Sequence, residues 1–436
     1  MSTINQTFKV GHEYLYSITS IPEISTENAV LNSASTSTNG ITLRKINDST
    51  LGLTCSNSNN TTGTITLNIT ISDKDNLYAN TYNISFNWEG TVQKTPVRIY
   101  NDDTVSNNIQ IYRTSSYAPA IDIYYYVGTT EGDNYIHFTD STTYGDSTPA
   151  LTITLEPQES VWIYSDTMTT WFSGNYDYIH INSSTNPASR KFVLSGNIMS
   201  LISGTLYQHC FFKLFYNFKG LYSVSSDFLP VTTLAYGCYE SMFYGCTSLV
   251  QAPALPATTL AIYCYYHMFE GCTSLTTAPA LPATTLEERC YNGMFTNCTS
   301  LTTAPELPAT TLAYSCYEGM FYGCTSLTTA PELPVTTLAN YCYYSMFYRC
   351  TSLTTAPELP ATTLANDCYL TMFYGCTSLT TAPELPATTL KEACYLGMFY
   401  NCTSLRTAPE LPATTIAYRC YYEMFQGCSS ITTAPE

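Results

Sequence analysis

The chain has 436 residues, of which 44% are hydrophobic and only 11% are charged. Globular domains usually carry about 25% charged residues, so this composition argues against disorder and for a chain that buries most of its length. The formal net charge of −17 argues against nucleic acid or an anionic membrane surface as a partner. No apolar stretch approaches the roughly 18 residues that cross a bilayer, so we expect no membrane insertion.

The first residues, MSTINQTFKVGHEY, contain neither the basic segment nor the apolar core of a secretory signal. If Met1 is the native start, we expect that the chain is not exported by the general route.

Residues 1–94 contain short runs of alternating apolar and polar residues, separated by clusters of Asn, Ser, Thr and Gly. Runs such as GTITLNITI and YNISFNW have the period of two that is typical of strands. We predict a β-sandwich of immunoglobulin-like size here, with anchoring as its expected role. Residues 95–198 repeat the pattern in IDIYYYV, ALTITL and SVWIY, which predicts a second β-rich, sandwich-like domain.

A period of 26 residues dominates the rest of the chain. Sixteen of the 18 cysteines fall in two series, from Cys238 to Cys420 and from Cys246 to Cys428. Such a period indicates a solenoid of stacked units. The unit, for example LPATTLANDCYLTMFYGCTSLTTAPE, occurs eight times in residues 229–436. Residues 199–228 hold a junction and a degenerate unit that contains Cys210, which we predict to be an N-terminal capping repeat.

Within one unit we predict a short strand from Ser378 to Glu384 and, on the opposite side, a helical turn or short helix from Cys368 to Cys376. The prolines of the APE and LP segments would break a long strand, so the strand must be brief. A unit cannot fold alone, since its apolar side chains supply about 15 kcal/mol against about 39 kcal/mol for ordering its backbone and side chains. Stacking must supply the difference.

The segments MFYGCTSL (Met372 to Leu379) and TTAPELP (Thr380 to Pro386) resemble the leucine-rich repeats of BspA-like bacterial surface proteins, in particular the bacterial surface protein 26-residue repeat. This resemblance implies a leucine-rich-repeat solenoid behind the two β domains, so the predicted fold class is mainly β with short helices. It also implies a role like that of the surface adhesins of gut bacteria, or of structural proteins of the tailed phages that infect them.

The paired cysteines have three interpretations. Two cysteines of one unit lie about 12 Å apart if helical, beyond the roughly 7 Å that a disulfide spans. Equivalent cysteines of neighbouring units lie about 5 Å apart, but their side chains point in parallel. No CxxC pair offers a zinc site. We therefore expect reduced, buried thiols and no metal, with a disulfide and a metal site as the alternatives.

One glutamate recurs at a fixed place in the unit, about 5 Å from its neighbours. Such a column could gather cations or meet a basic partner, but a solvated edge is the expectation that we favour. The column comprises Glu306, Glu332, Glu358, Glu384, Glu410 and Glu436.

Tyrosines vary from unit to unit beside the constant CY and MF pairs, while TSLTTAPELPATTL hardly changes. A face rich in Tyr, Ser, Asn and Gly has the composition of an antibody paratope, and tyrosines also stack on sugars. Tolerated drift at exposed places is the alternative. The candidate binding residues are Tyr236, Tyr263, Tyr266, Tyr314, Tyr341, Tyr344, Tyr418 and Tyr422.

Catalytic motifs are missing from the sequence. The five histidines are dispersed, and there is no HExxH, GxSxG or phosphate loop. We therefore expect no enzyme, no catalytic residue and no cofactor.

Two functions compete. The first is a virion structural or fibre protein of a phage of gut bacteria, anchored to other virion proteins by its N-terminal domains and displaying the repeats to a host-cell glycan or protein. The second is a secreted or lipid-anchored bacterial surface adhesin, located at the cell surface. We expect a homo-oligomer, and because the eighth unit ends without a cap, we expect either further chain or another subunit beyond Glu436.

Overall fold

The computed structural model describes the strands within residues 13–88 and then residues 95–433, apart from 115–117, 133, 143–147, 169, 174–176 and 184–190. The chain divides into two compact units, Met1–Thr95 and Pro96–Glu436. Each unit is described below by itself.

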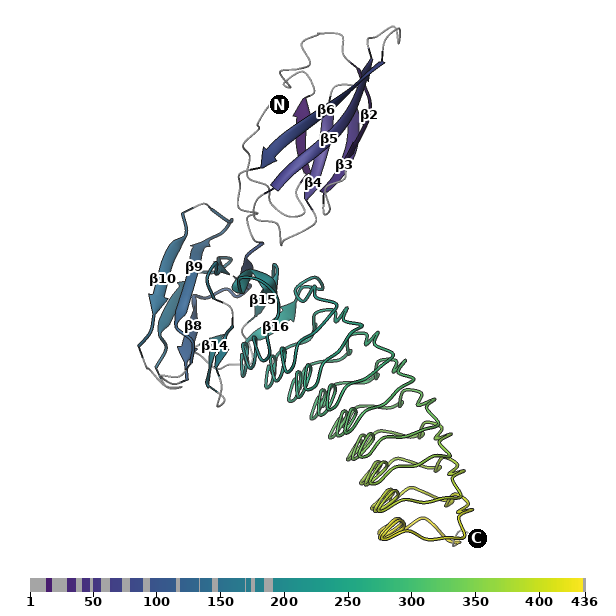
Figure 1. Ribbon diagram of the computed structural model, residues 1–436. Coiled ribbons are helices and arrows are strands. Elements are labelled where there is room, and N and C mark those ends of the chain that lie inside the picture. The colour runs from purple at the N-terminus through teal and green to yellow at the C-terminus, as the bar shows by residue number, and fades with distance from the viewer. Residues whose placement is uncertain are drawn as a thin grey trace. The chain divides into compact units, whose positions relative to one another are not determined.

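The first unit contains two three-stranded antiparallel sheets, with strand orders β1-β4-β3 and β2-β5-β6 (Figure 1). The predicted runs GTITLNITI and YNISFNW form the longest pair, β5 and β6. The prediction of strands is confirmed, and the immunoglobulin-like sandwich remains a prediction. The strands are β1 (Glu13–Ser17), β2 (Val30–Thr36), β3 (Ile41–Asn47), β4 (Thr50–Cys55), β5 (Gly63–Ser72) and β6 (Ala79–Trp88).

The second unit begins with two further sheets, with strand orders β10-β9-β12-β7-β15-β16 and β11-β8-β14-β13. Side chains alternate between buried and partly exposed along β7 and β8, so each strand turns one face inward, as its period-two sequence predicts. The strands are β7 (Val97–Asn101), β8 (Asn107–Arg113), β9 (Ile121–Gly128), β10 (Ile136–Asp140), β11 (Leu151–Leu155), β12 (Ser160–Tyr164), β13 (Phe172–Ser173), β14 (Asp177–Ser183), β15 (Phe192–Ser195) and β16 (Leu221–Val224).

These sheets continue directly into the repeats. Strand β15 pairs in parallel with β16, and Ser223 of β16 forms a parallel bridge with Gln251 of the first repeat. The other sheet also contributes, because the amide of Ile181 donates to the carbonyl of Leu214 at 2.7 Å. Strand edges of both sheets thus cover the outer side of the degenerate unit that contains Cys210. The open end of the stack is therefore closed by β-structure in addition to the predicted capping repeat.

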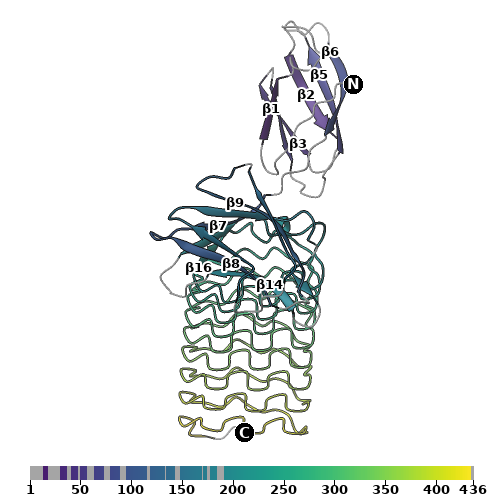
Figure 2. The ribbon, with the colours of Figure 1, turned by 90° about the vertical axis from the view of Figure 1, so that its left-hand side faces the viewer.

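The repeats lie as parallel coils stacked in register (Figures 1 and 2). We number the sequence repeats 1 to 8 from residue 229 and call each one a coil. One side of the stack is joined by parallel bridges between equivalent threonines, for example Thr329 with Thr355 and Thr337 with Thr363. The strand predicted from Ser378 to Glu384 is thus wrong in length, since only Thr381 forms a bridge there. The turn from Cys376 to Leu379 precedes Thr381, and Pro383 follows it after one residue, which explains why pairing does not extend.

The opposite side of each coil is a run of overlapping turns with positive φ at their third residues, and not the predicted helical turn or short helix. In coil 4 the amides of Glu318, Met320 and Tyr322 each donate to the carbonyl three residues back. The amides between them bond to the next coil: those of Gly319 and Phe321 donate to carbonyls of coil 5. An α-helix would need every amide for its own carbonyl four residues back. We call this segment, Cys316 to Cys324 in coil 4, the turn run. Alternate amides in it form hydrogen bonds between coils in place of the bonds of a helix.

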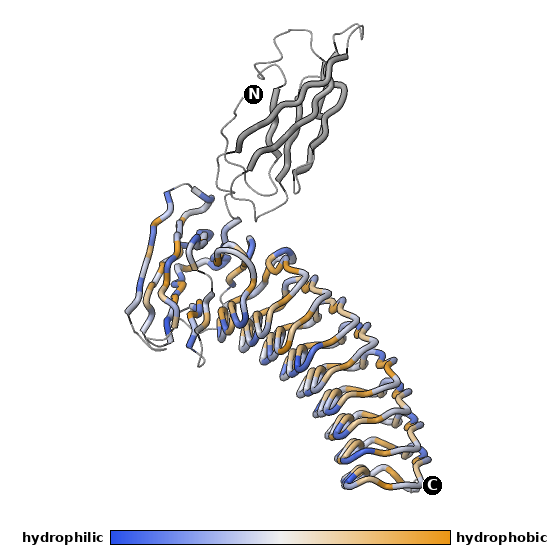
Figure 3. Tube along the Cα trace, viewed as in Figure 1, coloured by the Kyte–Doolittle hydropathy of each residue, from blue (hydrophilic) through white to orange (hydrophobic). Residues whose placement is uncertain are grey.

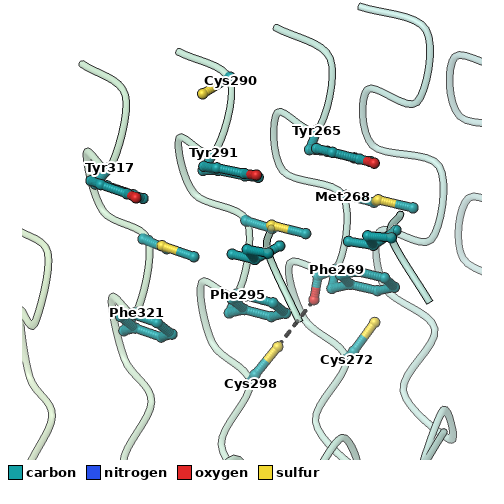
Figure 4. Close-up of a cluster of buried hydrophobic side chains, with 14 of the residues drawn as sticks. Tyr265, Met268, Phe269, Cys272, Cys290, Tyr291, Phe295, Cys298, Tyr317 and Phe321 are labelled. Carbon is teal, nitrogen blue, oxygen red and sulfur yellow. Dashed lines mark hydrogen bonds between the residues drawn. The ribbon is translucent and has the colours of Figure 1, made fainter. Parts of the chain in front are cut away.

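The inner face of the turn run forms the core of the stack (Figure 4), and hydrophobic residues recur in each coil along the trace (Figure 3). Equivalent rings stack in parallel, with centroids 5.8 Å apart for Phe295 and Phe321 and 5.9 Å for Tyr291 and Tyr317. The thiol of Cys298 donates to the carbonyl of Phe269 at 3.1 Å, and the same contact recurs from coil to coil. Cysteine therefore fills a narrow place and also pairs a buried carbonyl.

Helix is almost absent from the described residues, where only the 3₁₀ helix η2 (Ile198–Leu201) occurs. Within the part of the chain that the structure describes, no helix has the length and apolar character needed to cross a membrane.

Candidate functional site

Three columns of residues with left-handed backbone run along the turn side of the stack, one residue per coil in each column. In coil 4 they are Ser315, Gly319 and Gly323, with φ of 51°, 58° and 70°. We call them the first, second and third left-handed columns. Each lies at the third residue of a turn, where a type II turn needs positive φ and where Gly or Asn is favoured.

The third column follows that preference and the other two do not. With Asn217 of the degenerate unit included, eight of the nine residues in the third column are Gly or Asn, and Arg349 is the exception. The first and second columns instead include Tyr263, Tyr341, His267 and Thr371. A side chain in this conformation costs roughly 1–2 kcal/mol. The chain therefore keeps varied side chains on this face against the preference of its backbone.

The predicted tyrosines of coils 1 to 5 gather on this face as two connected groups. Tyr263 contacts Tyr236 and Tyr266, with ring centroids 5.6 and 5.2 Å apart. In the second group, Tyr341 lies 5.5 Å from Tyr314 and 6.0 Å from Tyr344. All six are half-buried or exposed. We call these six tyrosines the aromatic strip.

Arg289 of coil 3 joins the two halves of the aromatic strip. Its guanidinium carbon lies 5.5 Å from the Tyr263 ring centre and 5.1 Å from that of Tyr314, and it donates a hydrogen bond to the Tyr263 hydroxyl. Tyr418 and Tyr422 do not join the strip. They lie in coil 8, 65% and 54% exposed, with Arg419 over both rings.

A hollow of about 390 Å³ lies beside the aromatic strip and spans coils 2 to 5. Tyr266 of coil 2 and Tyr344 of coil 5 line it, and both also belong to the strip. Between them, Gly293 and Gly319 stand in the second left-handed column. The hollow thus exists because two coils with small residues lie between two coils with large ones.

The hollow also contains polar side chains that the sequence pattern does not identify as candidate binding residues. They include Asn292, Glu318 and Glu270, and the Glu270 carboxylate lies against Nδ1 of His267. Burial, together with the carboxylates of Glu240 and Glu318, raises the pKa of the Tyr266 hydroxyl above its ordinary value. The lining contains no Lys or Arg. The sequence does contain one signal for the hollow. Asn292-Gly293 and Gly319 stand at outer positions where coils 2 and 5 carry Tyr266 and Tyr344 or their neighbours.

The repeats also match a known family. The family model described as the BspA type leucine rich repeat region matches residues 214–354 and 288–432, with six copies. These ranges together span half of the sequence. The chain belongs to the BspA-type leucine-rich-repeat family. The resemblance inferred from MFYGCTSL and TTAPELP is thereby confirmed. No curated protein and no solved structure matches the chain.

The glutamate column of the BspA-type repeats lies away from the hollow and the aromatic strip. Glu332 and Glu358 line a shallow groove with the prolines of the APELP segment. Among the described residues, no group of three or more His, Cys, Asp or Glu side chains could hold a metal ion. Glu306, Glu332, Glu358, Glu384 and Glu410 are exposed, whereas Glu436 lies outside the described residues.

The cysteines of the BspA-type repeats are free thiols and are buried, as expected. Burial raises the pKa of Cys324 and of Cys376 to about 12. At neutral pH such thiols carry no thiolate, which is the form that reacts and that binds metals. The cysteine columns therefore belong to the core, and the outer face of the turn run remains the candidate site.

Proposed function

We propose that this chain is a non-catalytic adhesion protein whose BspA-type repeats present the outer face of the turn run to a host-cell surface. The observation that carries the proposal is the contrast between the left-handed columns. Where only the backbone matters, at the third column, Gly and Asn prevail. At the first and second columns, strained residues such as Tyr263 and Tyr341 are retained, and each of these two contacts another tyrosine of the aromatic strip, Tyr236 and Tyr314 respectively.

Tyrosine suits such a surface. Its ring offers a large amphipathic contact area with few rotatable bonds, so little conformational entropy is lost on binding. In the aromatic strip the rings are already held by one another and by Arg289, which lowers that cost further. The partner in this proposal is a glycan or protein of the host surface.

The wider arrangement is part of the same proposal. Two sandwich-like N-terminal domains, residues 1–94 and 95–198, precede a junction and capping repeat at 199–228 and a solenoid of eight leucine-rich units at 229–436. The N-terminal domains serve as the anchor in a homo-oligomer, and the solenoid carries the binding face.

For the biological setting we propose a virion, with the chain as a fibre or structural protein of a phage of gut bacteria and its first domain bound to other virion proteins. The Tyr-, Thr-, Asn- and Ser-rich composition and the LPATTL segment of the repeats support this setting. A bacterial surface adhesin is the second candidate, and membership of the BspA-type family favours it. Mass spectrometry of purified particles and of bacterial surface fractions separates the two settings.

Adhesion itself is tested with labelled full-length protein on a panel of gut bacteria and host epithelial cells. We expect saturable binding to at least one cell type, and a loss of at least tenfold in affinity when Tyr263 and Tyr341 are both replaced by Ala. Absence of binding to every cell type, or binding unchanged in the double variant, would contradict the proposal.

A further inference from the structure

We infer that the hollow across coils 2 to 5 binds a sugar residue of an uncharged glycan. This inference rests on the proposed adhesive function and names the ligand of that face. It depends on the shape of the hollow, on the side-chain amide of Asn292 in its lining, and on the balance of donors and acceptors there.

The shape of the hollow is fixed by its glycines. A Cβ added at Gly293 would lie 2.3 Å from Nδ1 of His267, so the histidine ring already occupies the space that a side chain would need. At Gly319 the nearest heavy atoms to such a Cβ are 3.9 Å away, so the backbone there is open to a ligand. Tyr266 and Tyr344 form the aromatic sides. The volume of about 390 Å³ falls in the range of small-ligand sites and suits one or two sugar rings.

Asn292 is the residue that points most directly to a ligand. It lines the hollow, yet it is only 7% exposed. Its backbone amide donates to the carbonyl of Arg289, so the backbone beneath the side chain is fixed. The side-chain amide can both donate and accept a hydrogen bond. A ligand with a polar group in the hollow can therefore pair with it.

The lining selects the kind of polar ligand, because it contains both donors and acceptors. Glu270 and Glu318 offer carboxylates that only accept, whereas the Asn292 amide and the Tyr344 hydroxyl can also donate. An ammonium group only donates and would leave the Asn292 donor unpaired. A phosphate or carboxylate only accepts and would face two glutamates without any Lys or Arg. A sugar presents several hydroxyls, each of which donates and accepts, so a single ring can pair with the whole set.

The aromatic sides complete the match to a sugar. One face of a pyranose ring carries C–H groups and packs on an aromatic ring, while its hydroxyls point outward to polar groups. Tyr266 is held by its contact with Tyr263 and by an edge-on contact with His267, whose ring centre is 4.0 Å away. The stacking surface is therefore pre-organised.

The test uses labelled full-length protein and polysaccharide extracted from the surface of cells to which it adheres. The extract is divided by anion exchange into an uncharged and an acidic fraction, and part of each is oxidised with periodate, which cleaves the vicinal diols of sugars. We expect binding to the uncharged fraction and loss of that binding after oxidation. Tyr344→Ala and Glu318→Gln should each weaken binding at least tenfold.

Tyr422→Ala is the matched control, because Tyr422 holds the same place in coil 8 and lies outside the hollow. It should change affinity less than twofold, and all three variants should keep the melting temperature of the parent protein within a few degrees. Binding only to the acidic fraction, binding that survives oxidation, or equal losses in Tyr344→Ala and Tyr422→Ala would overturn the inference. Adhesion to cells without any binding to their polysaccharide would overturn it too, while leaving the adhesive function intact. Failure to adhere to any cell would overturn both.

Discussion

The inner and outer faces of the turn run obey different rules, although they share one backbone segment. On the inner face, the same Cys, Tyr, Met, Phe and Cys recur in every repeat and stack on their equivalents. On the outer face, the residues change from coil to coil, even where φ is positive. The difference teaches that stacking is secured by the backbone amides and the inner side chains, so the outer side chains are free to serve recognition.

The hydrogen bonds explain how this separation arises. Alternate amides of the turn run bond to the next coil whatever side chain the residue carries. Coils therefore stay in register over Tyr, Glu, Asn or Gly at the outer positions. Repeat proteins in general depend on such contacts between nearest neighbours.

Alkaline pH should produce the largest effect, because it acts on the whole inner face. Burial raises the pKa of Cys324 and Cys376 to about 12 from an ordinary value of 9.0, so the folded state holds these protons more tightly than the unfolded chain. Their contribution to stability is complete below pH 9 and is lost as the pH rises towards 12. We expect cooperative unfolding in this window, followed by circular dichroism. A stack that stays folded at pH 12 would contradict the buried, neutral state of these thiols.

Truncation of one inner ring should produce the next largest effect, a loss of several kcal/mol in the free energy of unfolding. Phe321 is fully buried, between Phe295 at 5.8 Å and Phe347 at 5.7 Å. Phe321→Ala leaves a gap in the ladder and should lower the free energy of unfolding by about 3–5 kcal/mol, measured by urea denaturation.

Its neighbour on the outer face supplies the matched control. Tyr322 stacks on Tyr348 at 4.5 Å but remains partly exposed. Tyr322→Ala should cost no more than about 1.5 kcal/mol. Equal losses for Phe321→Ala and Tyr322→Ala would remove the distinction between the faces.

These two variants also show how far the sequence determines the fold. The 26-residue period and the apolar places predict the ladder that holds Phe321, because burial repeats with the unit. The turn run differs from the predicted helical turn or short helix, because Tyr263 or Thr371 gives no local sign of positive φ. Only the Gly and Asn of the third column carry that sign.

The candidate site was predictable to a similar degree. Variation among the repeats pointed to Tyr263 and Tyr341, and the structure brings them into the aromatic strip. The hollow was not predictable from any single repeat, because it depends on Gly293 and Gly319 lying between the tyrosines of other coils. Asn292 has a role only in that context.

A gain of stability should follow from placing glycine at Arg349, the one residue of the third column that is neither Gly nor Asn. Arg349 has φ of 57°, is exposed, and stands where every other coil has Gly or Asn. Arg349→Gly should raise the free energy of unfolding by about 1 kcal/mol, partly offset by the lost contact with the Tyr348 ring at 5.5 Å. The urea midpoint measures it, and a midpoint that falls would show that positive φ carries no cost here.

An exchange of outer faces tests the central claim most directly. The residues of coils 2 to 5 that line the hollow are replaced by their equivalents from coil 7, such as Leu396, Gly397 and Tyr400, while the inner face is left unchanged. Adhesion of this chimera to cells is compared with that of the parent protein, alongside its urea midpoint. We predict an unchanged fold and a loss of adhesion of at least tenfold. Adhesion equal to that of the parent protein, in a chimera that folds normally, would contradict the assignment of recognition to the outer face.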